Sequence, residues 1–243
     1  MNQAAVAGTV GDWTARNFRC VVVVEKYGID FHQEADVPLE EACRQRGLNV
    51  EAVLSELQAA AAPRQAMSGD WANISLRELT KHINARHHEY LKLELPRLRQ
   101  RLDRMAARHG ERDGALLSRL HAVYCGLQEE LELHLHKEEL ILFPVINRYD
   151  SAAETGYPIG APPFGTVRNP IQMMLREHDG ATEALQQMRT ITRDYVAADY
   201  ACANFRAVFA SLEELEADLL EHIRVENEFL FPRAAELEKA LLG

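Results

Sequence analysis

The chain has 243 residues, of which 27 are Lys or Arg and 37 are Asp or Glu, so its formal net charge is −10. Hydrophobic residues make up 47% and aromatic residues 7%, an ordinary composition for a soluble globular protein. Because nucleic-acid affinity comes mostly from Lys and Arg on backbone phosphates, the acidic balance argues against a nucleic-acid partner. No apolar run approaches the roughly 18–20 residues that span a bilayer, so no membrane partner is expected.

Two further features bear on location. The residues before Cys20 lack a basic start followed by an apolar stretch, which argues against a secretion signal. The four cysteines lie far apart with no C-x-x-C pair, a spacing that fits neither a disulfide framework nor a zinc site. They are Cys20, Cys43, Cys125 and Cys202. We therefore expect a cytoplasmic protein.

Residues 1–62 are predicted to form a small helical domain. Pro38 and the acidic residues after it open a short helix, which Gly47 closes. Asn49 can cap a second helix that runs to the end of this domain. Two short helices around a Gly turn are also compatible with a DNA-binding regulator, which the charge balance disfavours. Residues 63–72 show little periodicity and are predicted to be a linker.

Residues 73–243 are predicted to form four long helices. In the first, apolar residues recur at alternating intervals of four and three, which is the one-sided stripe of a bundle helix. This stripe is Leu91, Leu95, Leu98, Leu102 and Met105. Gly110 is predicted to end the helix. The later elements are a second helix to about residue 149, an irregular crossover over 150–170, and helices over about 171–195 and 201–239. The pattern predicts an all-α protein whose four-helix bundle follows a small helical domain.

An internal repeat relates the two halves of this bundle. The segment from His134 to Pro144 recurs from His222 to Pro232, at an offset of 222 − 134 = 88. Each copy places a Glu four residues after its His and a Phe-Pro pair nine and ten residues after it. Upstream, His88 matches His178 at an offset of 178 − 88 = 90. The bundle is therefore predicted to be two copies of one helical hairpin.

The repeat predicts a cluster of imidazoles and carboxylates. Residues four apart share one face of a helix, so each His lies beside its Glu in an apolar seam. The same seams are predicted to include Ile141 and Phe229. Gly110 follows His88 by 110 − 88 = 22 residues and precedes His134 by 134 − 110 = 24, so the two imidazoles lie at similar heights in an antiparallel hairpin. The predicted cluster is His88, His134, Glu138, His178, His222 and Glu226.

A metal pair is the natural counter-charge for this cluster. Two unpaired carboxylates in an apolar bundle are costly unless a cation compensates them. Each Glu can bridge two ions and each ion can take two His, which leaves room for a solvent-derived bridge and a small exogenous molecule. Imidazole-rich coordination without thiolates suits iron or manganese, with iron favoured. The alternative is a set of hydrogen-bonded structural His–Glu pairs, and the spacing leaves open which two His serve each ion.

The other histidines of the bundle are not assigned to the site. His87 and His136 flank candidate ligands but are predicted to point to other faces of their helices. His109 lies 109 − 88 = 21 residues after His88, about 30 Å along a straight helix. It is therefore predicted to lie near the turn at Gly110.

These residues resemble the hemerythrin-like di-iron proteins, and the whole chain is similar to the "repair of iron centres" family. That family helps to restore iron–sulfur clusters after nitrosative or oxidative stress. The matching stretches run from His82 to Pro96, from His134 to Pro144, over Glu177-His178-Asp179, and from His222 to Arg233. The resemblance implies iron ligation by the four predicted His, with Glu138 and Glu226 as bridges. It also implies two non-haem iron ions (Fe2+/Fe3+) with an oxo or hydroxo bridge.

The resemblance extends to the amino-terminal domain, with one departure. Residues 25–31 and 39–43 are similar to the family's small first domain. In the family, two cysteines follow the Phe that corresponds to Phe31, whereas here His32 and Gln33 follow it. Any step that the family assigns to this thiol pair is therefore not expected of this chain. His32 is predicted to be a solvent-facing loop residue, and a replacement ligand is the alternative.

Two functions follow as hypotheses. The first is a di-iron protein that binds nitric oxide or oxygen and supports iron–sulfur cluster repair, with nitric oxide reduction as one form of this activity. Its partners would be the gas, damaged iron–sulfur proteins and an electron donor. The second is a non-catalytic hemerythrin-like oxygen or redox sensor, or an iron-binding module, which suits the missing cysteine pair.

Overall fold

The computed structural model describes residues 8–14, 16, 18–31, 33–62 and 70–243. These residues form helices and, apart from one isolated bridge between Thr9 and Pro38, no extended pairing. The prediction of an all-α protein is confirmed. The described residues fall into two compact units. The first contains residues 8–62 with 101–117 and 189–215, and the second contains residues 70–100, 118–188 and 216–243.

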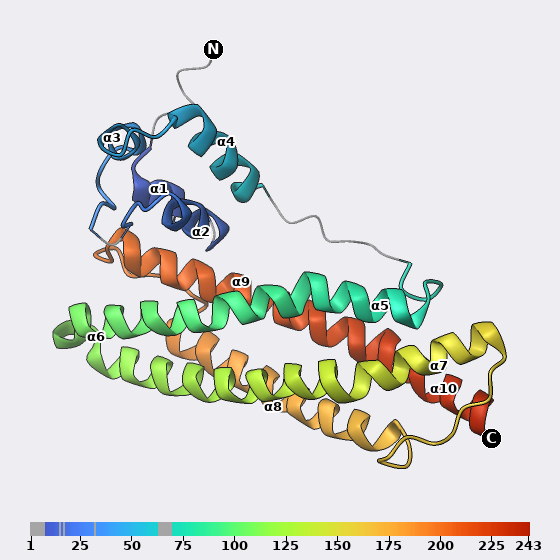
Figure 1. Ribbon diagram of the computed structural model, residues 1–243. Helices are drawn as coiled ribbons and strands as arrows, with labels where there is room; N and C mark the ends of the chain where they lie inside the picture. The colour runs from blue at the N-terminus through green and yellow to red at the C-terminus, as the bar shows by residue number, and fades with distance from the viewer. Residues whose placement is uncertain (1–7, 15, 17, 32, 63–69) are drawn as a thin grey trace. The chain divides into compact units, whose positions relative to one another are not determined.

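The amino-terminal helices of the first unit are short (Figure 1). They are α1 (Val10–Thr14), α2 (Phe18–Lys26), α3 (Leu39–Gln45) and α4 (Val50–Ala61). Asn49 caps α4 as predicted, because its side-chain oxygen accepts the Ala52 N–H at 3.1 Å. Gly47 has a φ of +64°, a left-handed conformation that allows the chain to turn between α3 and α4.

The remaining helices build the bundle (Figure 1). They are α5 (Leu76–Ile83), α6 (Glu89–Lys137), α7 (Phe143–Thr155), α8 (Arg168–Thr192), α9 (Ala203–Val225) and α10 (Phe231–Leu242). Three single π-helical turns join neighbouring helices without a loop: η2 (Asn84–His88), η3 (Glu138–Leu142) and η4 (Glu226–Leu230). An irregular crossover separates α7 from α8. None of the described helices is both long enough and apolar enough to cross a membrane.

The chain reverses direction inside α6. The Tyr124 hydroxyl donates to the Leu95 carbonyl at 2.7 Å, although 29 residues of straight helix would extend about 44 Å. The midpoint of these two positions is (95 + 124)/2 = 109.5, beside Gly110, and Figure 1 shows the reversal. The prediction that Gly110 ends the helix is nevertheless wrong, since helical structure continues through α6.

The π-helical turns shift the buried face by one residue. In η3 the Phe143 N–H bonds to the Glu138 carbonyl five residues earlier, which widens the turn just before Pro144. A proline ring clashes with the carbonyl four residues before it, so a wider turn relieves the contact. Ile141 is consequently 46% exposed, whereas Leu142 is buried. The prediction that Ile141 lies in the seam is therefore wrong.

The second hairpin repeats this shift. In η4 the Phe231 N–H bonds to the Glu226 carbonyl, again just before a proline, Pro232. Leu230 is fully buried, and Phe229 is only partly buried. The Phe-Pro pair of the repeat thus places a π-helical turn at the Glu of each hairpin.

Candidate metal centre

The structure brings all six predicted residues together within the second unit. Their side chains form two overlapping groups of four, and both groups contain Glu138 and Glu226. One group adds His88 and His222, and the other adds His134 and His178. Within each group the potential ligating atoms lie within 4.8 Å of one another. All six residues are at most 3% exposed, so the cluster is closed off from bulk solvent.

The distances pair imidazoles from different hairpins. The Nε2 atoms of His88 (η2) and His222 (α9) lie 3.2 Å apart, and those of His134 (α6) and His178 (α8) also lie 3.2 Å apart. The sequence left this pairing open because spacing along a chain does not say which neighbouring helix a side chain faces.

The two carboxylates lie between the imidazole pairs. Glu138 Oε2 is 3.4 Å from the Nε2 atoms of both His88 and His134. Glu226 places Oε2 3.2 Å from His178 Nε2 and Oε1 3.1 Å from His222 Nε2. Each carboxylate therefore reaches both imidazole pairs, as a bridging ligand must.

The Phe of each Phe-Pro motif supports an imidazole of its own hairpin. The Phe143 ring stacks on His88 with centroids 5.5 Å apart and an interplanar angle of 18°. The Phe231 ring stacks on His178 at 5.8 Å and 12°. Both Phe side chains are 2% exposed, so each forms part of the apolar wall of the site.

The electrostatics of the cluster fit bound cations. Apart from the ligand imidazoles at ion-pair distance, the carboxylate oxygens of Glu138 and Glu226 have no hydrogen-bond partner among the described residues. Burial, with the like charge of Glu226 beside it, raises the pKa of Glu138 well above its ordinary value. Burial also lowers the pKa of His88 to about 3 and that of His134 to about 4, so these imidazoles are neutral, as metal ligation requires.

Two family models match the chain. The model of the hemerythrin HHE cation binding domain matches residues 80–234, and a domain of unknown function, DUF542, matches residues 7–61. Both imidazole pairs lie within the first match, and α1 to α4 lie within the second.

Curated relatives match nearly the whole chain. The iron–sulfur cluster repair protein YtfE of Enterobacter sp. is 34% identical over 217 residues, covering 89% of this chain and 91% of that protein. YtfE of Escherichia coli is 32% identical over 216 residues, with coverages of 89% and 91%. The probable iron–sulfur cluster repair protein of Haemophilus influenzae is 31% identical over 217 residues, with coverages of 87% and 89%.

The chain belongs to the hemerythrin-like iron–sulfur cluster repair family. Its His- and Glu-rich cluster, inside the matched cation-binding domain, indicates iron binding in this family member. The family assignment made from the sequence is thereby confirmed.

In this family member, residues outside the cluster hold three of the imidazoles in place. The Nδ1–H of His88 donates to Glu139 at 2.9 Å, that of His134 to Glu177 at 2.9 Å, and that of His178 to Asn227 at 2.8 Å. Such contacts direct the opposite ring nitrogen, Nε2, toward the centre of the site. Lys92 and Lys137 in turn pair with Glu139 and Glu177. These partners were not predicted from the sequence, although each acceptor directly adjoins a predicted ligand and the repeat relates Glu139 to Asn227.

His87 is not among the grouped ligands and points to another face of its helix, as predicted, but that face is buried. Its side chain is 1% exposed, its Nδ1 lies 3.0 Å from Asp218 Oδ2, and its ring stacks on His222 with centroids 5.3 Å apart. Burial lowers the pKa of His87, although Asp218 opposes this shift. In a bundle helix that is packed on several sides, the residue beside a ligand faces another helix, here α9, rather than solvent. His136 lies on another face of α6 from His134, as predicted, and that face is exposed.

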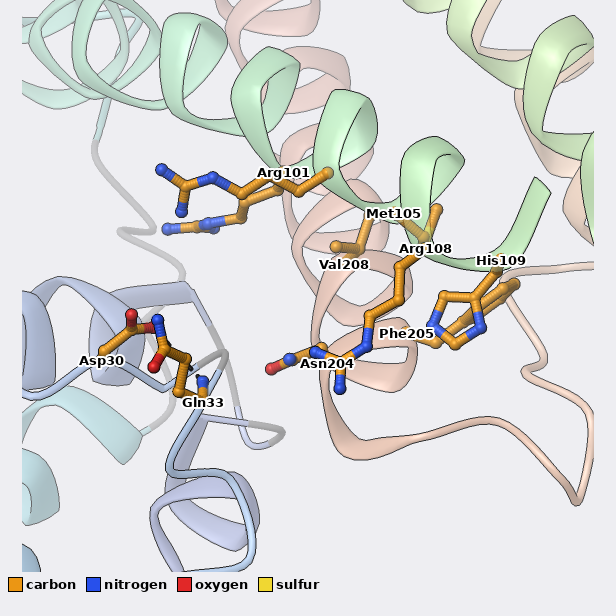
Figure 2. A pocket seen from close by; sticks show the side chains of 10 residues that line it. Asp30, Gln33, Arg101, Met105, Arg108, His109, Asn204, Phe205 and Val208 are labelled. Atoms are coloured by element: carbon orange, nitrogen blue, oxygen red, sulfur yellow. Dashed lines mark hydrogen bonds between the residues drawn. The ribbon is translucent and has the colours of Figure 1, made fainter.

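His109 lies outside the cluster, as predicted. It belongs to the first unit, where it lines a cavity of about 410 Å3 with Arg101, Arg108 and Phe205 (Figure 2). Its Nε2 is 3.4 Å from the Cys202 sulfur, and its ring meets Phe205 edge-on with centroids 5.6 Å apart. His32, the other histidine considered as a ligand, lies outside the described residues.

Proposed function

We propose that this protein supports iron–sulfur cluster repair through two non-haem iron ions held in the six-residue cluster. One ion would be bound by His88 and His222 and the other by His134 and His178, with Glu138 and Glu226 bridging them. The observation that carries this proposal is two fully buried carboxylates set between four imidazoles, without a protein cation in the cluster. The relatives named as cluster repair proteins support the assignment of the cellular role.

When bound, such an iron pair supplies redox chemistry and open coordination positions, which suit nitric oxide or oxygen. A solvent-derived oxo or hydroxo bridge would complete the pair. The chain itself contributes neutral imidazoles, two bridging carboxylates and an apolar wall that includes Phe143 and Phe231. Outside the cluster, Glu139 and Glu177 fix the orientation of the ligands. The implied partners are damaged iron–sulfur proteins, the gas and an electron donor, in the cytoplasm.

A sensor is the second candidate function. The observation that favours it is the absence of the family's two cysteines after Phe31, where this chain has His32 and Gln33. A sensor binds the gas without consuming it. Nitric oxide supplied with an excess of reductant therefore separates the two functions: sustained consumption supports an enzyme, and a single stoichiometric uptake supports a sensor.

The first test is the metal content and the visible spectrum of aerobically purified protein. About two irons per chain are expected, and Glu138→Ala and Glu226→Ala should each lose both ions because each carboxylate reaches both imidazole pairs. Glu129→Ala, on the exposed face of α6, is the matched control and should retain both irons. Folded protein that never binds iron under iron-replete anaerobic loading would refute the proposed site.

A further inference from the structure

The four ligand imidazoles differ in whether their Nδ1 atom has a hydrogen-bond acceptor. The internal repeat shows which residue should be the acceptor of each. The first His of each hairpin is held in the same way. His88 donates to Glu139 at 2.9 Å, and His178 donates to Asn227 at 2.8 Å. These two acceptors are equivalent positions, since 139 + 88 = 227.

The second His of each hairpin is held differently in the two copies. His134 donates to Glu177 at 2.9 Å. The position equivalent to Glu177 in the other hairpin is 177 − 90 = 87, which is His87. By the symmetry of the repeat, His87 should accept the Nδ1–H of His222.

His87 does not accept that hydrogen bond. Its ring is nearly parallel to that of His222, with an interplanar angle of 7° and centroids 5.3 Å apart, and no hydrogen bond joins the two rings. Its own Nδ1 contacts Asp218 at 3.0 Å. The Nδ1 of His222 is buried and has no hydrogen-bond partner among the residues that the structure describes.

We propose that the two metal positions are unequal, and that the ion held by His88 and His222 is bound more weakly and leaves first because His87 offers no acceptor to His222. Both positions share Glu138 and Glu226, so the carboxylates do not distinguish them. An acceptor behind a ligating imidazole fixes the ring and raises its basicity, and losing one typically weakens metal binding about 10- to 100-fold. His87 is thus a positioning residue that acts through His222. This proposal rests on the proposed function only in requiring two bound ions.

Release kinetics test the inequality directly. The protein is loaded anaerobically with ferrous iron to two ions per chain, and capture by the chelator ferrozine is followed by absorbance. Two phases of equal amplitude are expected, with rate constants that differ about 10- to 100-fold. Release of both ions in a single phase would overturn the proposal, whereas protein that binds no iron would refute the proposed function instead.

Two variants assign the phases. His87→Gln offers an amide oxygen to His222 and an amide N–H to Asp218, and it should slow the fast phase toward the slow one. Glu177→Ala removes the acceptor of His134 and should accelerate the slow phase while leaving the fast one in place. His136→Gln, an exposed position on α6, is the matched control and should change neither. If His87→Gln leaves the fast phase unchanged, or if Glu177→Ala leaves the slow one unchanged, the assignment to His222 fails.

Discussion

The two helical hairpins contribute the same inner residues, the His and Glu of the cluster, but different outer residues, those that contact the ligand imidazoles from behind. Each contributes one His near the start of the hairpin and a second His with a Glu four residues later, and each ends the motif with a Phe-Pro pair over a π-helical turn. Behind these ligands the copies diverge: Glu139 in the first corresponds to Asn227 in the second, and His87 in the first corresponds to Glu177 in the second.

The difference separates two kinds of requirement. Inner donors must be of a fixed type, because a metal ion needs neutral imidazole nitrogens and carboxylate oxygens at short range. Outer partners need only orient those donors, so an amide, a carboxylate or a stacked ring can occupy equivalent positions with graded effects. We therefore expect changes to inner residues to alter how many ions bind, and changes to outer residues to alter how tightly they bind.

The largest effects should come from removing imidazoles in pairs. If His88 and His222 share one ion, the double variant His88→Ala/His222→Ala should keep about one iron per chain. The double variant His88→Ala/His178→Ala takes one ligand from each ion and should keep almost none. Elemental analysis of anaerobically loaded protein distinguishes these outcomes. The reverse result would show that His88 and His178 serve the same ion.

The Phe of the two hairpins should be equally important to stability. Phe143→Ala and Phe231→Ala each remove a buried ring that stacks on a ligand. Each should lower the free energy of unfolding of the metal-free protein by about 3–5 kcal/mol, as is typical for deleting a buried aromatic side chain. Urea denaturation at neutral pH provides the measurement. A change confined to one hairpin would argue that the two halves are not equivalent in packing.

Acid should destabilise the metal-free protein. His88 and His134 have pKa values of about 3 and about 4 in the folded protein, below the ordinary value of 6.5, because burial disfavours their charged forms. Between pH 6.5 and about 4 the unfolded chain therefore binds a proton at each of these two positions that the folded chain does not. These two protons outweigh the one extra proton that the raised pKa of Glu138 lets the folded chain hold, so stability falls as pH falls. Urea midpoints measured at pH 7 and pH 5 should show this loss.

His134→Phe provides the control for that titration, since it removes one buried imidazole while keeping an aromatic ring. The variant should lose less stability between pH 7 and pH 5 than the unaltered chain. Equal losses in both proteins would mean that other groups dominate the acid response.

The sequence was sufficient for the level and composition of the site. Periodicity placed His134 and Glu138 in one seam, and the distances of His88 and His134 from Gly110 placed these two imidazoles at similar heights. The offsets of 88 and 90 then identified their counterparts in the second hairpin. It was not sufficient for details that depend on helix geometry. Ile141 and Leu142 exchanged exposure because η3 inserts a wider turn, which an α-helical period does not contain.

Contacts between helices also could not be predicted from the periodicity of the sequence. His87 was assigned to another face because adjacent residues on a helix diverge, yet that face packs against α9 and His222. Likewise, the pairing of imidazoles depends on which helices are neighbours in space. Both properties arise from tertiary packing, so they become visible only when the second hairpin is placed against the first.

The smallest predicted effect concerns the one neutral acceptor behind the ligands. Asn227→Asp gives the second hairpin the carboxylate that Glu139 provides in the first, so it should strengthen the hold of His178 on its ion. His178 already has a hydrogen bond to Asn227 at 2.8 Å, so the substitution changes only the charge of the acceptor. The rate constant of the slower release phase should therefore decrease by less than about ten-fold. Ferrozine capture provides the measurement, and the faster phase serves as an internal control because His178 does not serve that ion. Acceleration of the slower phase would show that the site tolerates no further negative charge, and that the neutral Asn227 is required to balance Glu138 and Glu226.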